Sequence, residues 1–451
     1  MAPSNKKKGA VDEALAGATE KVLKEIAKLY DSGLNEGSGK AGAGTVGLRS
    51  IADSSQLQMV MRKPRKKVSI MIVGNHSAGK SSFINWYIGE QIQKTGVAIE
   101  TRGFTFVTSG KKRETLTGDA TMRYFDFLSG FTKFEGIIPN LFTEISTSKE
   151  KNFLCVDFID TPGLVDGDMQ YPFDVQEAIL WMAEHVDLIL VFFDPIGQAT
   201  CKRTMQVVEK LNNGPHLEKI HYFMSKADAV EKEHDRQRVL IQITQNLATR
   251  IRNSHAFNLP TFYLPRDDGE ASAIPNAIEE VCKEIDKSIN MTVQKNLRLL
   301  KEDCERILAR CDVVQAEDKV KKARNLKVTL QGLALMSGAW VAGALLLGLL
   351  AARVMPAVCR VADHMCQATH IQTLVRISPA VQEHFALVGG VLLVVMVVLL
   401  VASKLTWKTA PVFNKKDLKK LDEHRAVTKA IMSEESDLYQ KYFDTLSHAE
   451  R

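Results

Sequence analysis

The chain has 451 residues, of which 45% are hydrophobic and 25% are charged, with a formal net charge of +6 at pH 7. This length suits two or three domains, or one large domain with extensions, and so mild a charge gives no reason to expect a nucleic-acid partner. The seven cysteines include no CxxC pair, which argues against a zinc site or a disulfide scaffold.

The N-terminal residues, 1–67, predict a helix followed by a linker. Residues 11–30 repeat apolar side chains at helical spacing, and a Gly-rich connection follows. The linker ends in the basic run RKPRKK at 62–67. That run is either a solvated edge of the next domain or a contact with lipid head groups.

From residue 68 to about 290, short apolar runs alternate with helical patterns. The expected strands are VSIMIV, GFTFVTSG, NFLCVDFID, VDLILVFFD, KIHYFMS and PTFYLP. The expected helices cover 80–90, 173–186, 199–212, 233–253 and 271–297. This alternation predicts an α/β domain over 68–290, with a mostly parallel sheet and helices on both faces.

The C-terminal part begins with a predicted helical stalk, 291–327, which is dense in charge and contains no Pro or Gly. Two uncharged stretches follow, 25 residues at 328–352 and 19 residues at 385–403. Each is long enough to cross a hydrocarbon core as a helix. The alternative is a pair of buried core helices, but charges only at their ends favour transmembrane helices. Small residues four apart permit close helix packing in the first span: Gly338 with Ala342, and Ala344 with Gly348.

Basic residues are distributed unequally around these spans. Six lie within twenty residues before the first span, six lie within twenty residues after the second, and three lie in the connection at 353–384. This bias predicts a multi-pass integral membrane protein with both termini in the cytosol and a non-cytosolic connection. A disulfide between Cys359 and Cys366 would then be possible, on the non-cytosolic side of the membrane. Residues 404–451 predict a cytosolic helix that packs back against 291–327.

The stretch GNHSAGKS, at 74–81, matches the phosphate-binding pattern GxxxxGKS directly after a predicted strand and at the start of a predicted helix. Its small residues allow successive backbone N–H groups to surround the β- and γ-phosphates. Lys80 brings a positive charge to those phosphates, and the Ser81 hydroxyl is a ligand for Mg²⁺. The candidate nucleotide-binding residues here are Gly74, Asn75, His76, Ser77, Ala78, Gly79, Lys80, Ser81 and Ser82.

Two further motifs follow predicted strands. In Asp160-Thr-Pro-Gly163, the aspartate at a strand end can hold Mg²⁺, and the N–H of Gly163 can sense the γ-phosphate. In the stretch SKAD, at 225–228, Asp228 would accept hydrogen bonds from a guanine base while the stem of Lys226 packs on its face. Ser225 is not the usual first residue of this motif, so the identity of the base is less well indicated than the binding of the phosphates.

Between the first two motifs, IETRGFTFV contains candidates for a switch threonine that contacts Mg²⁺ and the attacking water. Thr101 is the candidate, and Thr105 is the runner-up. Arg102 beside it is either an arginine finger that acts across a dimer or an exposed arginine.

The stretches GNHSAGKSSFI, ETRGFTFV, YFDFLSGFTKF, VDFIDTPGLVDGDMQ, AILWMAEHVDLILVFFD and FMSKADAVE resemble the dynamin superfamily of membrane-acting GTPases. Within that superfamily the resemblance is closest to the EH-domain-containing ATPases, and it covers roughly residues 11–290. It implies a P-loop NTPase with a dynamin-type G domain and a flanking helical bundle. It also implies GTP (or ATP) and Mg²⁺ as cofactors, contact with membrane lipids, a homodimer through the nucleotide-binding face, and higher oligomers.

Several departures from the family pattern matter. His76 stands where dynamins carry Gln, so it either helps to arrange the hydrolytic water or faces solvent. No EH domain follows the helices, and the paired spans are similar in layout to those of mitofusins and atlastins. EH-domain-containing relatives use ATP whereas the wider superfamily uses GTP, and we expect GTP here.

Together these features predict a membrane-anchored, dynamin-like GTPase whose catalytic residues are Lys80, Thr101 and His76, with Ser81, Thr101 and Asp160 as ligands of the metal. Its expected output is membrane tethering, fusion or remodelling at the endoplasmic reticulum, the mitochondrial outer membrane, or a plastid or vesicle membrane. The alternatives are a membrane scaffold that binds nucleotide with little hydrolysis, or an ATPase. A transporter is disfavoured because the spans contain no ionisable residue.

Overall fold

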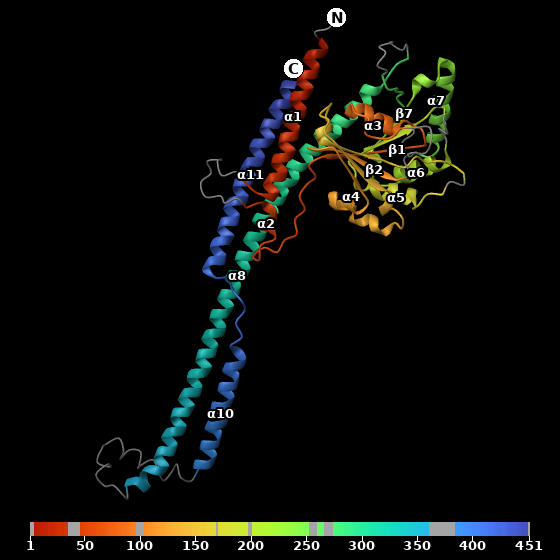
Figure 1. Ribbon diagram of the computed structural model, residues 1–451. Helices are drawn as coiled ribbons and strands as arrows, with labels where there is room; N and C mark the ends of the chain where they lie inside the picture. Colours follow the sequence, from red (N-terminus) through yellow and green to blue (C-terminus); the bar gives the residue numbers. More distant parts are fainter. Residues whose placement is uncertain are drawn as a thin grey trace. The chain divides into compact units, whose positions relative to one another are not determined.

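The computed structural model of the protein describes residues 4–34, 46–95, 103–167, 170–196, 201–251, 259–265, 274–359 and 384–449. These residues form two compact units. The first comprises Met1–Asp53, Met59–Glu305 and Val427–Arg451, and the second comprises Ser54–Gln58 and Arg306–Ala426. Figure 1 shows the ribbon of the chain and labels its α-helices and the strands β1, β2 and β7.

The first unit is built on a seven-stranded sheet with the order β3-β4-β2-β5-β1-β6-β7. Four neighbouring pairs are parallel, and two, β2 with β5 and β3 with β4, are antiparallel. The expected mostly parallel sheet is therefore confirmed. The strands are β1 Val68–Gly74, β2 Phe104–Ser109, β3 Glu114–Thr117, β4 Leu141–Ser146, β5 Val156–Asp160, β6 Leu188–Phe193 and β7 Ile220–Met224.

The sequence did not predict β3 and β4, and it predicted one strand too many. β3 reads ETLT and lies on the edge of the sheet with its side chains largely in solvent, so it has no apolar run to signal it. The stretch PTFYLP contributes only an isolated bridge between Thr261 and Met224. Its two prolines lack the N–H group that a longer ladder needs, which explains the difference.

Helices cover both faces of the sheet, as Figure 1 shows for α3 on one side and for α4, α5 and α6 on the other. On the α3 face, Phe83 packs edge-on against Phe158 and Phe192. On the other face, Val73 and Phe106 share a core with Met182 of α5. The helices and 3₁₀ segments around the sheet are α3 Lys80–Ile88, α4 Asp119–Tyr124, η1 Asp126–Lys133, η2 Ile138–Asn140, η3 Phe153–Cys155, α5 Val175–Ala183, α6 Lys202–Asn213, η4 Leu217–Lys219, η5 Ala227–Ala229 and α7 Glu233–Ala248.

A helical bundle completes the first unit. It contains α1 (Ser4–Asp31), the start of α8 (Ile278–Cys359) and the end of α11 (Lys415–Ala449), with the short α2 (Leu48–Ala52) before the sheet. Tyr30 of α1 donates to Asp303 of α8 (Oη···Oδ2 2.7 Å), and Tyr442 of α11 donates to Asn290 of α8 (Oη···Oδ1 2.8 Å). Both bonds join segments more than 150 residues apart in sequence, so the chain ends return to the same bundle.

α8 is a single helix from Ile278 to Cys359. The domain limits expected at residues 290 and 327 fall inside it. No proline or glycine occurs between Ile278 and Gln331, so nothing in the sequence breaks the backbone hydrogen bonds there.

The second unit is an antiparallel arrangement of α8 with α10 (Phe385–Thr406), followed by the start of α11. Near one end of α10, Ser403 Oγ donates to Gly332 O at 3.0 Å. At its other end, the guanidinium of Arg353 lies 4.5 Å from the centroid of the Phe385 ring. Small residues make this packing close, because a Cβ on Gly338 would lie 3.4 Å from Leu399. Gly348, by contrast, has nothing within 4 Å of such a Cβ.

The connection from α10 to α11 is fastened to α8. The side chain of Asn325 both donates to Ala410 O (2.8 Å) and accepts from Ala410 N (2.9 Å). Phe413 N donates to Asp318 Oδ1 at 2.8 Å, and Arg425 of α11 pairs with Asp312 of α8. The expectation that the last segment packs back against the 291–327 region is confirmed.

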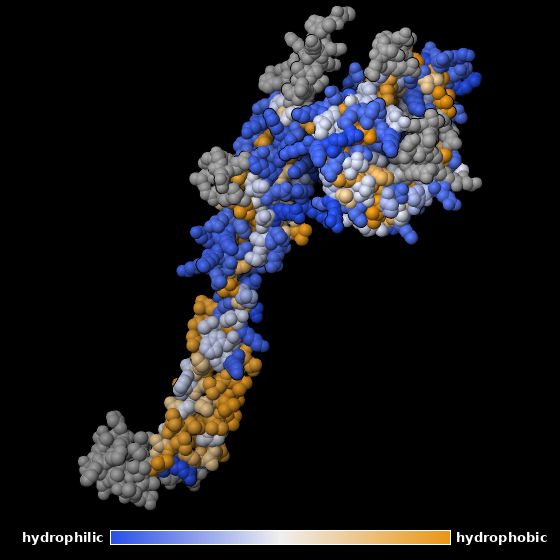
Figure 2. All heavy atoms as spheres, viewed as in Figure 1, coloured by the Kyte–Doolittle hydropathy of each residue, from blue (hydrophilic) through white to orange (hydrophobic). Residues whose placement is uncertain are grey.

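α8 and α10 are both long and apolar enough to cross a membrane, with mean hydropathies of 2.1 and 3.1 over their most apolar windows. Their apolar side chains are mostly exposed, including Trp340 and Leu347 on α8 and Leu387 on α10. Figure 2 shows this surface as an apolar region over the two helices. The alternative of two buried core helices is therefore wrong.

The basic run at 62–67 is used largely within the first unit. Lys63 pairs with Asp31, and Arg65 pairs with Asp187. Lys67 donates to Thr108 Oγ1 at 2.6 Å. Three of the five charges of the run thus fasten the linker to the sheet domain, which favours the structural interpretation over a lipid contact.

Candidate nucleotide-binding site

The GxxxxGKS stretch forms a tight loop between the end of β1 and the start of α3. Gly74 allows close approach, because a Cβ there would lie 2.5 Å from Phe192 O. Ser77 has φ +63° and Gly79 has φ +77°, so both residues are in the left-handed region. Left-handed residues in a loop that leads into a helix N-terminus are typical of backbone that binds an anion.

Lys80 is buried at the first turn of α3, with 6% of its surface exposed. Its ammonium donates to Asn75 O at 3.3 Å and to Gly74 O at 3.5 Å. Burial lowers the pKa of Lys80, while Asp160 acts against this shift and Lys226 adds to it. Because a buried ammonium with two long hydrogen bonds is poorly compensated, an oxyanion at the loop would stabilise it.

Asp160 ends β5 beside the start of α3 and is fully buried. Ser81 Oγ donates to its Oδ2, while its Oδ1 has no hydrogen-bond partner among the described residues. Burial raises the pKa of Asp160, against the effects of Lys80 and the Ser81 hydrogen bond. The hydroxyl of Ser81 and the carboxylate of Asp160, with one free oxygen, are hard ligands of the kind that Mg²⁺ prefers, so these residues fit the ion.

No group of three or more His, Cys, Asp and Glu side chains converges within the part of the chain that the structure describes.

The DTPG stretch lies directly against the phosphate loop. His76 N donates to Leu164 O at 3.0 Å, and Leu164 N donates to Gly74 O at 3.1 Å. A Cβ on Gly163 would lie 2.9 Å from the Cα of His76, so only glycine fits without displacing backbone. The structure therefore brings Gly163 and His76 together, and the half-buried His76 is held through its backbone.

The SKAD stretch meets the same loop from β7. Ser225 Oγ donates to Ala78 O at 2.8 Å and to Phe193 O at 3.2 Å. Lys226 has φ +53°, and a Cβ on Gly79 would lie 3.7 Å from its Cε. Asp228 is half-buried in η5. Serine can stand first in this motif here because its hydroxyl reaches the phosphate-loop carbonyl.

The other expected residues need separate mention. Asn75 is buried, and its side-chain amide has no partner among the described residues. Ser82 lies on the first turn of α3 and is half-buried. Thr101, with Arg102, lies outside the described residues. The runner-up Thr105 is buried within β2, opposite Asp160 in the antiparallel register, so it is part of the sheet.

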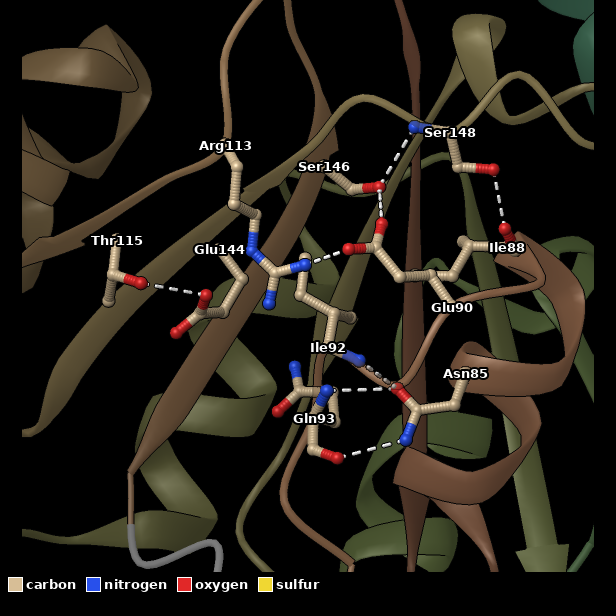
Figure 3. A network of polar contacts seen from close by, with 10 residues as sticks. All are labelled: Asn85, Ile88, Glu90, Ile92, Gln93, Arg113, Thr115, Glu144, Ser146 and Ser148. Carbon is tan, nitrogen blue, oxygen red and sulfur yellow. Dashed lines mark hydrogen bonds and ion pairs between the residues drawn. The ribbon is translucent and has the colours of Figure 1, made fainter.

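A polar network fixes the segment that leaves α3 toward β2 (Figure 3). The Asn85 side chain accepts from Ile92 N and Gln93 N and donates to Gln93 O, all within 3.1 Å. Glu90 pairs with Arg113 and accepts from Ser146 Oγ. The start of the loop that leads to Thr101 is thus held by both α3 and the strands.

The sequence analysis missed a second set of contacts, beyond the DTPG stretch. Tyr171 Oη donates to Gly163 O at 2.7 Å and accepts from Val165 N. Asp166 accepts from the backbone N–H groups of Lys202 (2.7 Å) and Arg203 (3.0 Å) at the start of α6. These contacts tie the segment after Gly163 to α6. An aspartate and a glycine in LVDG indicate a turn, but nothing in the sequence names its partner.

Sequence comparison adds an independent observation. A family model described as "Dynamin family" matches residues 70–213, which extend from β1 to the end of α6. EH domain-containing protein 2 of Arabidopsis thaliana is 28% identical over 173 residues, which are 37% of this chain and 31% of that protein. EH domain-containing protein 2 of Homo sapiens is 27% identical over 174 residues, with the same two coverages of 37% and 31%. The match thus spans less than a third of either relative.

Among solved structures, an oligomerised bacterial dynamin pair aligns over 96% of this chain and 79% of its own, with a TM-score of 0.41 and 13% identity. Era of Aquifex aeolicus bound to GDP·AlF4⁻ aligns over 49% of this chain and 57% of its own, with a TM-score of 0.28 and 15% identity. Both TM-scores are below 0.5, so neither alignment adds to the family match. The order of the sheet and the matched residues together identify a dynamin-type G domain within a P-loop NTPase fold.

Proposed function

We propose that the protein hydrolyses GTP, in preference to ATP, and that its two apolar helices anchor it in a membrane; the match of residues 70–213 to the model described as "Dynamin family" supports this proposal. The observation that carries the proposal is the meeting of three motifs around Gly79. Lys80 and Ser81 lie beside Asp160, His76 lies beside Gly163, and Ser225 bonds to Ala78. Residues that could bind the phosphates, the metal and the base therefore lie at one end of the sheet.

In this proposal the loop N–H groups and Lys80 hold the β- and γ-phosphates. Ser81, Asp160 and Thr101 would hold Mg²⁺, which would neutralise the charge that develops during phosphoryl transfer. Thr101 and His76 position the attacking water. The N–H of Gly163 would contact the γ-phosphate, so hydrolysis would remove this contact and allow the DTPG segment to move.

Base recognition is assigned to the SKAD segment. Asp228 accepts hydrogen bonds from guanine, and the stem of Lys226 packs on the face of the base. The Ser225–Ala78 hydrogen bond supports this assignment, because it places the segment against the phosphate loop. GTP is therefore the expected substrate, and ATP is the alternative to be tested beside it.

Membrane work is assigned to α8 and α10. The excess of basic residues outside 353–384 favours cytosolic termini. The endoplasmic reticulum and the mitochondrial outer membrane are the membranes to be tested. The chain would form a homodimer through its nucleotide-binding face and then higher oligomers that tether, fuse or remodel membranes. The domain limits 1–67, 68–290, 291–327, 328–352, 353–384, 385–403 and 404–451 remain part of this proposal.

The direct test is phosphate release by the full chain in liposomes, with GTP and ATP compared and Lys80→Ala as the control. We expect Mg²⁺-dependent turnover with GTP and a loss of at least about tenfold in the variant, because Lys80 is the charge at the γ-phosphate. Nucleotide binding without turnover would instead support a membrane scaffold. Absence of nucleotide binding would contradict the proposal altogether.

A further inference from the structure

A buried carboxylate beside the nucleobase segment has no role in the mechanism so far. Asp194 follows β6 directly, and only 3% of its surface is exposed. Burial of a charged carboxylate is unfavourable unless hydrogen bonds and a counter-charge compensate it. Two groups do so among the described residues. Ile196 N donates to Asp194 Oδ1 at 2.9 Å, and the ammonium of Lys226 lies 3.8 Å from Asp194 Oδ2.

The surroundings of Lys226 explain why it needs this partner. Its backbone is left-handed, its Cε lies beside Gly79, and 42% of its side chain is exposed. The nearby ammonium of Lys80 repels it, as the contribution of Lys226 to the lowered pKa of Lys80 indicates. Without a negative charge on its other side, the end of Lys226 would swing into solvent.

The backbone holds Asp194 at the correct place. Ser225 N donates to Phe193 O at 2.9 Å, and Ser225 Oγ donates to the same carbonyl. The residues that follow Phe193 and Ser225, Asp194 and Lys226, therefore leave neighbouring strands side by side. Met224 pairs with Phe193 in the parallel register of β6 and β7, which fixes this relation.

We propose that Asp194 is a positioning residue for the nucleobase: its carboxylate holds the ammonium of Lys226, so that the aliphatic stem of the lysine stays where the base packs. This inference rests on the proposed function, since it presumes a nucleotide in the site. It assigns Asp194 no contact with the phosphates or with Mg²⁺.

The test is a double-mutant cycle on nucleotide binding. Asp194→Asn keeps the shape and an acceptor for Ile196 N–H but removes the charge, and Lys226→Met keeps the stem but removes the ammonium. Binding of fluorescently labelled GTP and GDP to the full chain is measured with Mg²⁺ for the wild type, both single variants and the double variant. We expect each single variant to weaken binding by roughly fivefold to thirtyfold, and the double variant to be no weaker than Lys226→Met.

The weakening should be the same for GTP and GDP, because the base is common to both. A residue that acted at the γ-phosphate would affect GTP more. Effects that multiply in the double variant, or a change below twofold in Asp194→Asn, would overturn the inference.

Asp187→Asn is the matched control. Asp187 stands just before the other end of β6, where its carboxylate likewise accepts a backbone N–H, that of Ser69 at 3.0 Å, and pairs with Arg65 at 3.3 Å. The same chemical change there should leave nucleotide affinity within twofold of the wild type. Equal weakening by both variants would mean that loss of a carboxylate at either end of β6 merely disturbs the sheet.

If Asp194→Asn does not fold, Asp194→Ser serves in its place, because a serine can accept from Ile196 N but cannot reach Lys226. Failure of the inference and failure of the proposed function are distinguishable. If the wild type binds no nucleotide, the proposed function fails. If the wild type binds nucleotide and Lys80→Ala does not, but the Asp194 variants match the wild type, only the inference fails.

Discussion

At the residue scale, the closest approach in the candidate site is between the phosphate loop and the DTPG stretch. Gly163 and His76 are in backbone contact, since a Cβ on Gly163 would lie 2.9 Å from the Cα of His76. The two loops are also joined through Leu164 and Gly74. Any motion of the DTPG stretch on γ-phosphate release would therefore also move the phosphate loop.

Gly163→Ala tests this contact. The added methyl meets backbone and cannot be relieved by a side-chain rotation, so we expect an overpacking cost of about 1–3 kcal/mol that displaces the two loops. GTP turnover should fall by at least about tenfold, and labelled-GTP binding should weaken less. Gly17→Ala in α1, where a Cβ meets nothing within 4 Å, is the control and should leave turnover unchanged. Wild-type turnover in Gly163→Ala would contradict this account.

Another residue-scale feature follows the DTPG stretch. Arg203 donates to Gly167 O at 3.2 Å, and its guanidinium lies 5.4 Å from the centroid of the Tyr171 ring. Desolvation acts to raise the pKa of Asp166, but the hydrogen bonds that its carboxylate accepts from the backbone N–H groups of Lys202 and Arg203 outweigh it, so the pKa is lowered. Asp166 is therefore ionised when it caps α6, and this cap fastens the segment after Gly163 to a rigid helix.

At the element scale, the packing of α8 on α10 uses only one of the two small-residue pairs in the first span. Gly338 and Ala342 face α10, since Ala342 is buried and Gly338 approaches Leu399. Ala344 and Gly348 are exposed. The Gly338–Ala342 pair thus packs against α10 of the same chain. Of the two pairs, only Ala344 with Gly348 is exposed and could pack against a second copy of the chain.

Gly338→Leu and Gly348→Leu form a matched pair of substitutions in one helix. A leucine at 338 overlaps α10, whereas a leucine at 348 enters open space. We expect Gly338→Leu to destabilise the packing of α8 on α10 by about 1–3 kcal/mol and Gly348→Leu to leave it unchanged. The readout is the temperature at which the detergent-solubilised chain loses cooperative structure. Equal shifts in both variants would show that α10 does not pack on this face.

At the scale of the whole molecule, the proposed arrangement across the membrane rests on the distribution of charge. Basic residues next to membrane spans are retained on the cytosolic side. Twelve lie before the first span or after the second, and three lie in the connection between the spans. The residues at 360–383 lie outside the described part of the chain, so the sequence alone supports this orientation.

Single-cysteine labelling tests it in sealed vesicles whose cytosolic face points outward. In a chain without other cysteines, Lys441→Cys should react at once with a membrane-impermeant maleimide. Cys366, kept as the single cysteine, should react only after permeabilisation. Labelling of both before permeabilisation would mean that 353–384 does not cross the membrane.

Much of this protein could be predicted from its sequence because the signals are local. A strand, a loop of small residues and a helix N-terminus are contiguous between Val68 and Ile88, and their chemistry is readable without any partner. The same holds for the DTPG turn after β5 and for the apolar character of the stretches at 328–352 and 385–403. The structure confirms these elements within one or two residues of their expected limits at β1 and α3.

Only the tertiary structure decided which distant groups meet. Ser225 reaches Ala78 across 147 positions, and Asp194 reaches Lys226 because parallel strands end at one edge of the sheet. The polar edge strand β3 forms because β4 supplies its hydrogen bonds, not because its own side chains favour it. Local side-chain pattern determines whether a segment is a strand, a loop or a helix. Its hydrogen-bond and charge partners depend on strand order, which no local pattern encodes.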